Sequence, residues 1–262
     1  MRRYARVYAA CVRNCLVREL EFRANFALST TANLGWAILS MLLAGMIFGN
    51  VRQVAGWDLD RMFLVIGTYV MVEHVTSVLF QPNMAKLSEL VNRGELDFVL
   101  MKPISSQFLV SARYVDFKDL PGVFVGLAYV LVGVQRLELR PGPIEVGLYL
   151  LLVVCATLAV YALWFITVTF SLWTGRVNNI AYLIVPVTDL ARVPTDVFRG
   201  LARPLLTFAI PVALIATLPA KALLGVLEPG MASYQVGLTA ALLWTSHRFW
   251  RYSLTRYSSA SS

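Results

Sequence analysis

Long apolar runs separated by short polar segments dominate this 262-residue chain. A run of about 18 to 20 apolar residues is long enough to cross the hydrocarbon core of a bilayer as a helix. We assign six such runs, which cover residues 25–48, 62–80, 117–134, 146–173, a stretch that begins near 180, and 236–250. The pattern predicts an all-α polytopic membrane protein with six transmembrane helices in a single transmembrane domain, residues 1–262.

Two of the six runs are irregular. Charged residues stand at the start of the third run, so we expect a helix that begins near Ser106 and kinks near Pro121 before it enters the bilayer. Gly122 and Gly126 lie one turn apart in this run and are expected to serve helix packing within the chain. The fifth run is interrupted by two prolines and two charges: Pro186, Asp189, Arg192 and Pro194.

Residues 1–23 predict a helix that lies in the membrane interface. Tyr4, Val7 and Cys11 fall on one side of it, whereas Arg6 and Arg13 fall on another. A helix of this kind buries its apolar side and directs its arginines toward lipid headgroups and water.

Residues 194–231 alternate prolines with short apolar runs. The run 205–218 contains Pro211 at its middle, and it is short for a span but long for a loop. A broken, re-entrant segment fits this pattern best.

The distribution of charge sets the orientation. Six spans with both termini in the cytoplasm place 15 Lys and Arg inside and eight outside. A seventh span at 205–218 would turn the three C-terminal arginines outward, against the positive-inside rule. We therefore expect residues 84–105 and a tail at 252–262 in the cytoplasm, and residues 194–231 outside.

Composition agrees with a membrane protein. Hydrophobic residues make up 58% of the chain, charged residues make up 15%, and the mean hydropathy is +0.66. These values lie outside the range of soluble globular proteins. The net charge of +8 does not indicate nucleic-acid binding, because Lys and Arg gather at the ends of apolar runs.

The sequence carries no recognisable chemistry for nucleotide hydrolysis. It has no GxxxxGK(S/T) loop, no GxGxxG after a strand, no HExxH and no GxSxG. Cys11, Cys15 and Cys155 form no metal-ligand pattern with His74 and His247. We therefore predict no catalytic and no metal-binding residues, and we expect energy for any transport from a partner or an ion gradient.

Four ionisable side chains fall at membrane depth: Glu73, His74, Asp189 and Arg192. Such groups are costly in lipid, so they are candidates for a translocation path. Because adjacent residues of a helix point about 100° apart, Glu73 and His74 cannot both face one partner. An interhelical hydrogen bond or ion pair within the bundle is the alternative role.

The polar segment 84–105 follows the second span and begins as a short amphipathic helix. Leu87 and Leu90 fall on one side at helical spacing, whereas Glu89 and Arg93 fall on others. A cytoplasmic segment of this kind either caps the bundle in water or docks on a soluble partner through an apolar centre and a charged rim.

Gly94 can turn the chain after this helix, and Pro103 closes the segment because a proline disfavours helix at the residue before it. The residues that we predict to contact a partner are apolar, charged and turn residues of this segment: Leu87, Glu89, Leu90, Arg93, Gly94, Glu95, Leu96, Asp97 and Pro103.

Three stretches carry a resemblance to a known family. They are RGELDFVLMKPISSQF (93–108), SLWTGR (171–176) and TDVFRGLARPLLTFAIPVALIATLPAKALLG (195–225). In this order they resemble the signatures of a bacterial family of ABC transporter permeases of the type-2 exporter group, and the resemblance covers essentially the whole chain. It implies an interfacial N-terminal helix, six spans, and a broken external hairpin between spans five and six, in a bacterial inner membrane.

The resemblance also implies function and partners. The chain would be the permease subunit of an ATP-driven exporter, and residues 84–105 would dock on a separate ABC ATPase dimer. ATP and Mg would bind to that ATPase, and this chain would bind no cofactor. A second permease, identical or related, would form a dimer with it among membrane lipid, and no nucleic acid would be bound.

Two alternatives from other classes remain. A lipid-acting membrane enzyme or scramblase would use Glu73, His74 and Asp189 as its site, but no paired acidic or metal motif accompanies them. An ion-coupled secondary carrier usually shows repeated halves, and no such repeat is visible here.

Overall fold

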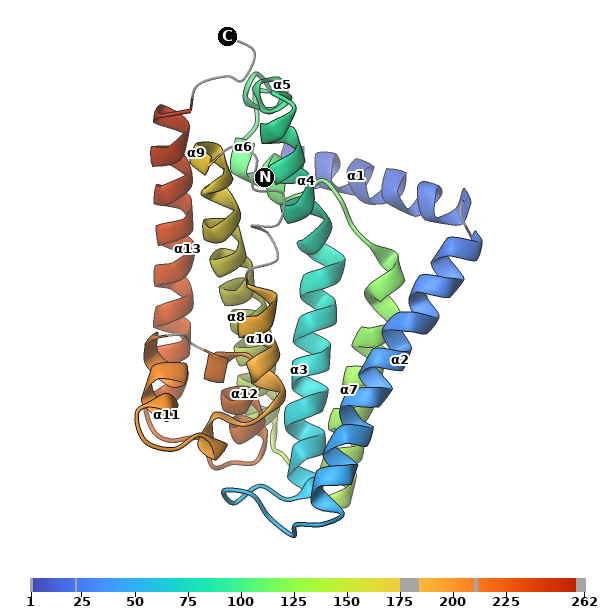
Figure 1. The fold of residues 1–262 in the computed structure, drawn as a ribbon, viewed down its shortest axis with the longest axis vertical. Helices are drawn as coiled ribbons and strands as arrows, with labels where there is room; N and C mark the ends of the chain where they lie inside the picture. Colours follow the sequence, from blue (N-terminus) through green and yellow to red (C-terminus); the bar gives the residue numbers. More distant parts are fainter. Residues whose placement is uncertain (1, 22, 175–183, 210–211, 258–262) are drawn as a thin grey trace.

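The computed structural model describes residues 2–21, 23–174, 184–209 and 212–257. Within these ranges the chain is helical and contains no β-strand. The long helices are α1 (Arg2–Glu21), α2 (Arg23–Phe48), α3 (Leu59–Leu79), α7 (Leu120–Arg136), α8 (Pro143–Thr169) and α13 (Met231–Thr255). Helix α3 lies at the centre of an elongated bundle, and α1 lies across one end of it (Figure 1).

Shorter elements lie between the long helices along the chain. Those up to residue 174 are α4 (Gln81–Asn92), α5 (Leu96–Leu100), α6 (Ser106–Ala112), η1 (Phe117–Asp119) and α9 (Ser171–Thr174). Those in the following part of the chain are α10 (Val185–Asp189), η3 (Leu190–Arg192), η4 (Thr195–Val197), α11 (Ala202–Pro204), η5 (Leu205–Ala209), η6 (Val212–Leu214) and α12 (Thr217–Leu223).

Four helical segments of the described residues are long and apolar enough to cross a membrane: Phe26–Met46, Leu59–Leu79, Phe117–Arg136 and Pro143–Trp173. Two further stretches, Ala202–Phe208 and Val212–Leu223, meet at 64° and add a fifth if they form one broken span. The first four predicted spans are therefore confirmed. The molecule is an all-helical, multi-pass membrane protein.

The sixth predicted span lies within α13, which is not one of the four. With 25 residues, α13 is about 37 Å long, enough to cross a bilayer. Its hydropathy is lower because it carries polar and basic residues, and two of the polar ones face neighbouring helices. Gln235 donates to the carbonyls of Leu152 (2.8 Å) and Leu214 (3.1 Å), and Thr239 donates to that of Cys155 (3.3 Å). The protein itself thus accepts the hydrogen bonds that the Gln235 amide N–H groups and the Thr239 hydroxyl donate.

The third span begins differently from our expectation. Helix α6 ends at Ala112, residues 113–116 form no helix, and α7 begins at Leu120. The prediction of a single helix with a kink at Pro121 is therefore wrong. Pro121 lies in the first turn of α7, where a backbone N–H makes no hydrogen bond within the helix, so a proline fits there without a kink. Asn83 of α4 fixes the break by bonding both backbone groups of Tyr114 (2.7 and 2.8 Å).

The fifth predicted span is described only in part. Its start near residue 180, and the turn predicted at 174–179, lie outside the described residues. From Val185 onward the chain forms the short helices α10 and η3 instead of one continuous helix. The breaks fall close to Asp189 and Pro194, two of the interruptions that the sequence showed.

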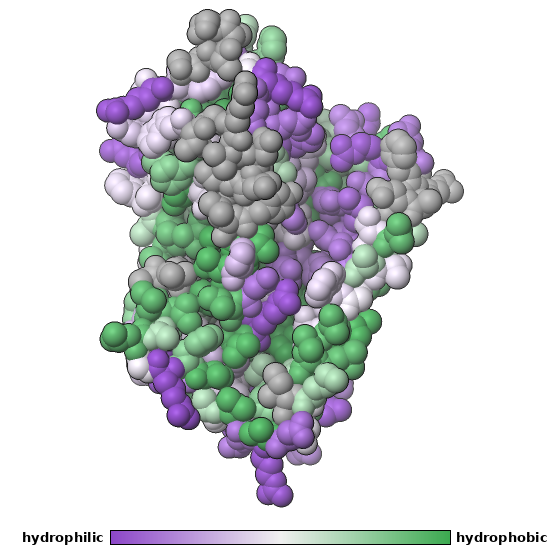
Figure 2. Space-filling model, viewed as in Figure 1, coloured by the Kyte–Doolittle hydropathy of each residue, from purple (hydrophilic) through white to green (hydrophobic). Residues whose placement is uncertain are grey.

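The ends of the bundle differ in what they carry. Helices α1, α4, α5 and α6 lie at the same end as the C-terminal end of α13, whereas α11, α12 and the loop between α2 and α3 lie at the other (Figure 1). On the face that Figure 2 shows, hydrophobic residues cover much of the middle, and hydrophilic ones gather toward both ends. The predicted interfacial helix and the segment 84–105 thus lie at the same end of the bundle.

Helices α3 and α7 approach each other closely at glycines. A Cβ atom at Gly67 would lie 2.8 Å from the carbonyl oxygen of Gly126, and one at Gly126 would lie 2.6 Å from the nitrogen of Met71. Gly122 lies against the ring of His74 in the same way. The prediction that Gly122 and Gly126 serve packing within the chain is therefore confirmed.

We expect Gly126→Ala to push α3 and α7 apart and to lower stability by about 1–3 kcal/mol, the usual cost of overpacking. The thermal midpoint of the detergent-purified protein measures this. Gly147→Ala in α8 is the matched control, because a Cβ atom there would meet nothing within 4 Å. Equal midpoints for the two variants would contradict the packing role.

Candidate functional site

The segment 84–105 folds as α4 and α5 joined by a tight turn. At the end of α4 the N–H of Gly94 donates to the carbonyl of Val91 (3.2 Å), and the N–H of Glu95 donates to that of Leu90 (2.9 Å). This helix-ending motif needs a residue with positive φ, and Gly94 has a φ of +68°. The turn predicted at Gly94 is confirmed.

The apolar side chains of this segment lie mostly in the core of the protein itself. Leu87 and Leu96 are both 0% exposed, and they belong to one cluster with Phe165 of α8 and Trp250 of α13. Leu90 packs partly buried against this cluster. Leu87 and Leu96 cannot enter a partner groove while the segment keeps this fold, so their predicted docking role is corrected to an internal one.

Two exposed apolar side chains that the sequence analysis missed lie at the tip of the segment. Phe98 is 69% exposed and Met101 is 79% exposed. They are three positions apart, which places them on one face of a helical turn, while Leu96 and Val99 occupy the buried face. The same three-residue spacing in the sequence could have indicated this second, outward face.

Charged groups lie beside the tip. Glu89 pairs with Lys86 (2.5 Å) and with Arg93 (2.7 Å). The hydrogen bond and charge of Lys86, with a smaller contribution from Arg93, lower the pKa of Glu89. The other predicted docking residues remain exposed or partly exposed: Arg93, Gly94, Glu95, Asp97 and Pro103.

A second candidate site lies at membrane depth between α3 and α10. The hydroxyl of Tyr69 donates to Asp189 Oδ1 (2.8 Å) and accepts from Arg192 Nε (3.2 Å). Arg192 also pairs with Asp189 (3.1 Å). Glu73, one turn after Tyr69, lines a cavity of about 90 Å³ together with Thr188 and Asp189. We call this the polar groove.

The polar groove combines two acids, one base and a tyrosine hydroxyl inside an otherwise apolar bundle. The fold thus brings together Glu73, Asp189 and Arg192, three of the four deep charges that the sequence singled out. Tyr69 was missed, although its position one turn before Glu73 indicates a shared face. Such a groove can hold polar or charged groups of a cargo at membrane depth.

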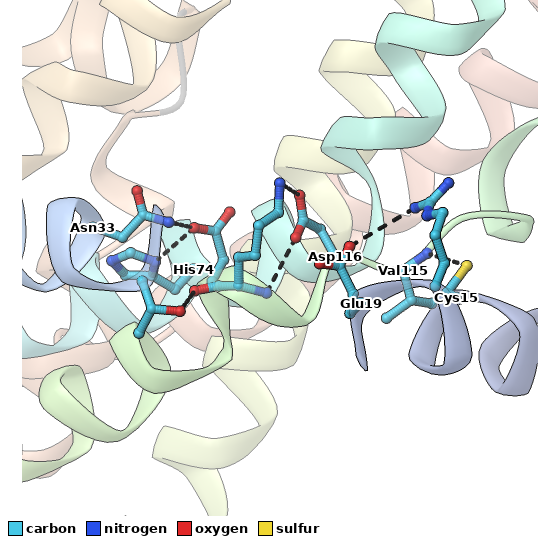
Figure 3. Close-up of polar contacts among 10 residues, drawn as sticks. Cys15, Glu19, Asn33, His74, Val115 and Asp116 are labelled. Carbon is cyan, nitrogen blue, oxygen red and sulfur yellow. Dashed lines mark hydrogen bonds and ion pairs between the residues drawn. The ribbon is translucent and has the colours of Figure 1, made fainter. Parts of the chain in front are cut away.

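His74 lies away from the polar groove. Its Nδ1 is 3.9 Å from Asp119 Oδ1, and Asn33 of α2 donates a hydrogen bond to the same carboxylate (Figure 3). The two neighbours Glu73 and His74 therefore face different elements, as the angle between adjacent helical positions requires. His74 is 7% exposed and serves the junction of α2, α3 and α7.

If water fills the polar groove, a membrane-impermeant maleimide should react with a Glu73→Cys variant in a background that carries Cys11→Ser. Glu73 is exposed, whereas Val70 of the same helix is 1% exposed and does not line the cavity, so Val70→Cys should stay unreacted. Mass spectrometry of the labelled protein measures both. Absence of labelling in the Glu73→Cys variant would contradict an aqueous groove.

The sequence model of one family, described as ABC-2 family transporter protein, matches residues 34–261. No curated protein and no solved structure matches the chain. The match spans all three stretches on which the resemblance rests, as well as the polar groove and the segment 84–105. The chain therefore belongs to the ABC-2 transporter family and is an ABC-2 type permease.

Proposed function

We propose that this chain is the membrane-spanning permease subunit of an ATP-driven exporter and that a separate ABC ATPase dimer supplies its motive force. The family match favours this function over a lipid-acting enzyme or an ion-coupled carrier. ATP and Mg would bind to the ATPase, because the chain has no phosphate-binding loop. A second permease, identical or related, would complete the translocation path.

The exposed pair Phe98 and Met101 carries this proposal. Large apolar side chains exposed next to charged ones match the composition of a protein interface, where an apolar centre is surrounded by a polar rim. Arg93 and Glu95 are exposed nearby and would form that rim. The predicted coupling function of residues 84–105 is kept, but its contact side chains are now Phe98 and Met101.

The segment is also built to transmit force. Leu87 and Leu96 share a core with Phe165 and Trp250, so a push on the exposed tip acts on α8 and α13 directly. ATP-driven closure of the ATPase dimer would then shift the permease between two packed arrangements, inward-open and outward-open.

The six-span topology, with both termini in the cytoplasm of a bacterial inner membrane, is part of the proposal. Helix α1, the segment 84–105 and the C-terminal end of α13 all lie at one end of the bundle, and this arrangement supports the proposed topology (Figure 1). At the opposite end, Asp196 accepts from Trp57 (3.2 Å) and pairs with Arg203 (2.7 Å) and Lys221 (2.8 Å). These contacts would anchor a broken external hairpin in residues 194–231.

Two features support a second permease and a path between the copies. The span Phe26–Met46 of α2 is only 6% buried within the chain, so lipid or another permease must cover most of it. The polar groove offers Glu73, Asp189 and Arg192 as groups that cargo would pass. The cargo itself would be selected by these charges and by what the second copy adds.

The double variant Phe98→Asp/Met101→Asp should bind the partner ATPase about 30-fold more weakly, the effect of losing an interface hot spot. Both side chains are exposed, so the variant should elute and melt like the parent protein. Copurification of a tagged ATPase expressed with the permease measures binding.

Val226→Asp is the matched control, since Val226 is 62% exposed and lies between α12 and α13, away from this tip. Leu96→Asp should instead unfold the segment, because it buries a charge in the core. Unchanged ATPase binding by the double variant, or an equal loss with Val226→Asp, would contradict the docking proposal.

A further inference from the structure

Helix α1 is fixed to residues 105–115 at two points. The ring of Tyr4 packs edge-on against Phe108 with centroids 5.0 Å apart, and its hydroxyl accepts from the N–H of Ser105 (3.4 Å). The thiol of Cys15 donates to the carbonyl of Arg113 (3.9 Å) and accepts from the N–H of Val115 (3.5 Å). The two points are about 16 Å apart along α1.

Between these two points a gap remains between α1 and the helices that it faces. A cavity of about 370 Å³ separates α1 from α4, α5 and α6. Val7, Cys11 and Asn14 line it from one face of α1, at the spacing of successive helical turns. Five aliphatic side chains line the opposite wall: Leu90, Val99, Ile104, Leu109 and Val110.

Three basic side chains also line this cavity: Lys86, Lys102 and Arg113. Lys86 is paired with Glu89, but Lys102 and Arg113 carry no ion pair within the part of the chain that the structure describes. The guanidinium of Arg113 lies over the ring of Tyr114, 5.3 Å from its centroid, which restricts its position. The cavity therefore combines apolar side chains with two cations, Lys102 and Arg113, that form no ion pair with an acid among the described residues.

We propose that this cavity binds an anionic phospholipid, with the phosphate at Lys102 and Arg113 and the glycerol and upper acyl region against the aliphatic side chains of the opposite wall. Basic pockets of membrane proteins near the lipid headgroups bind acidic lipids in this way. The proposal goes beyond the transport role and rests only on the position of α1 in the membrane interface. Because α4 and α5 form part of the wall, the lipid would brace the segment that carries Phe98 and Met101.

The test compares lipid retention by the purified permease without any ATPase. Native mass spectrometry should show phosphatidylglycerol bound in preference to phosphatidylcholine. Each basic residue near an anionic group contributes about fivefold to binding, so Lys102→Gln/Arg113→Gln should retain about 25-fold less phosphatidylglycerol. Arg248→Gln/Arg251→Gln, exposed on α13 and outside the cavity, removes the same charge and should retain it normally. Equal retention by the two double variants overturns the proposal.

A second readout needs no charge substitution. Cys11 lines the cavity and is partly exposed, whereas Cys15 and Cys155 are buried. N-ethylmaleimide should alkylate Cys11 more slowly in nanodiscs of phosphatidylglycerol than in nanodiscs of phosphatidylcholine. Equal rates overturn the site. Protection by inorganic phosphate in phosphatidylcholine nanodiscs overturns the lipid assignment in favour of a free phosphate.

Discussion

The segment 84–105 has no hydrophobic core of its own. Leu87 and Leu96 are buried against aromatic side chains of α8 and α13, where the rings of Phe165 and Trp250 lie 5.3 Å apart. Burying a leucine side chain contributes about 1.5–3 kcal/mol, so these contacts fix where the segment lies. Trp250 also donates to the hydroxyl of Ser106 (3.1 Å), which extends the link to α6. The place where an ATPase would push is therefore held by the helices that would have to move.

The first four membrane-crossing segments could be predicted from the sequence because length and apolar character decide them locally. Gly94 could be predicted as a turn for the same reason, since its positive φ is a property of one residue. The buried face of residues 84–105 could not be predicted from the sequence. Helix α4 has 12 residues and α5 has five, too few to show a clear period, and both faces carry apolar side chains. Neighbours distant in sequence, on α8 and α13, decide that Leu96 is buried and Phe98 is not.

The polar groove could likewise be predicted from the sequence only in part. A charge inside an apolar run is visible in any sequence, so Glu73, Asp189 and Arg192 could be singled out. Their grouping depends on α10 lying beside α3, which no local pattern encodes. His74 was grouped with them by depth alone, and the fold instead places it against Gly122 and near Asp119. Tyr69 could not be singled out, because the sequence does not show whether the hydroxyl of a tyrosine in a membrane span has a hydrogen-bond partner.

The segment 84–105 contains most of α4, α4 also lines the cavity beside α1, and the polar groove is lined by α3 and by Gln81 of α4. Helices α3 and α4 follow each other at Phe80. A displacement at the tip would reach the polar groove and the cavity if the tip and α13 move as one body. Spin labels on Asn92→Cys, at the end of α4 next to the tip and outside the docking pair, and on Thr245→Cys measure this directly by double electron–electron resonance in the ATPase complex, in a background without native thiols. Binding of ATP should leave this distance unchanged, while the distance from the label on Asn92→Cys to Ala32→Cys on α2 should shift. A shift between the tip and α13 would contradict rigid transmission through the shared core.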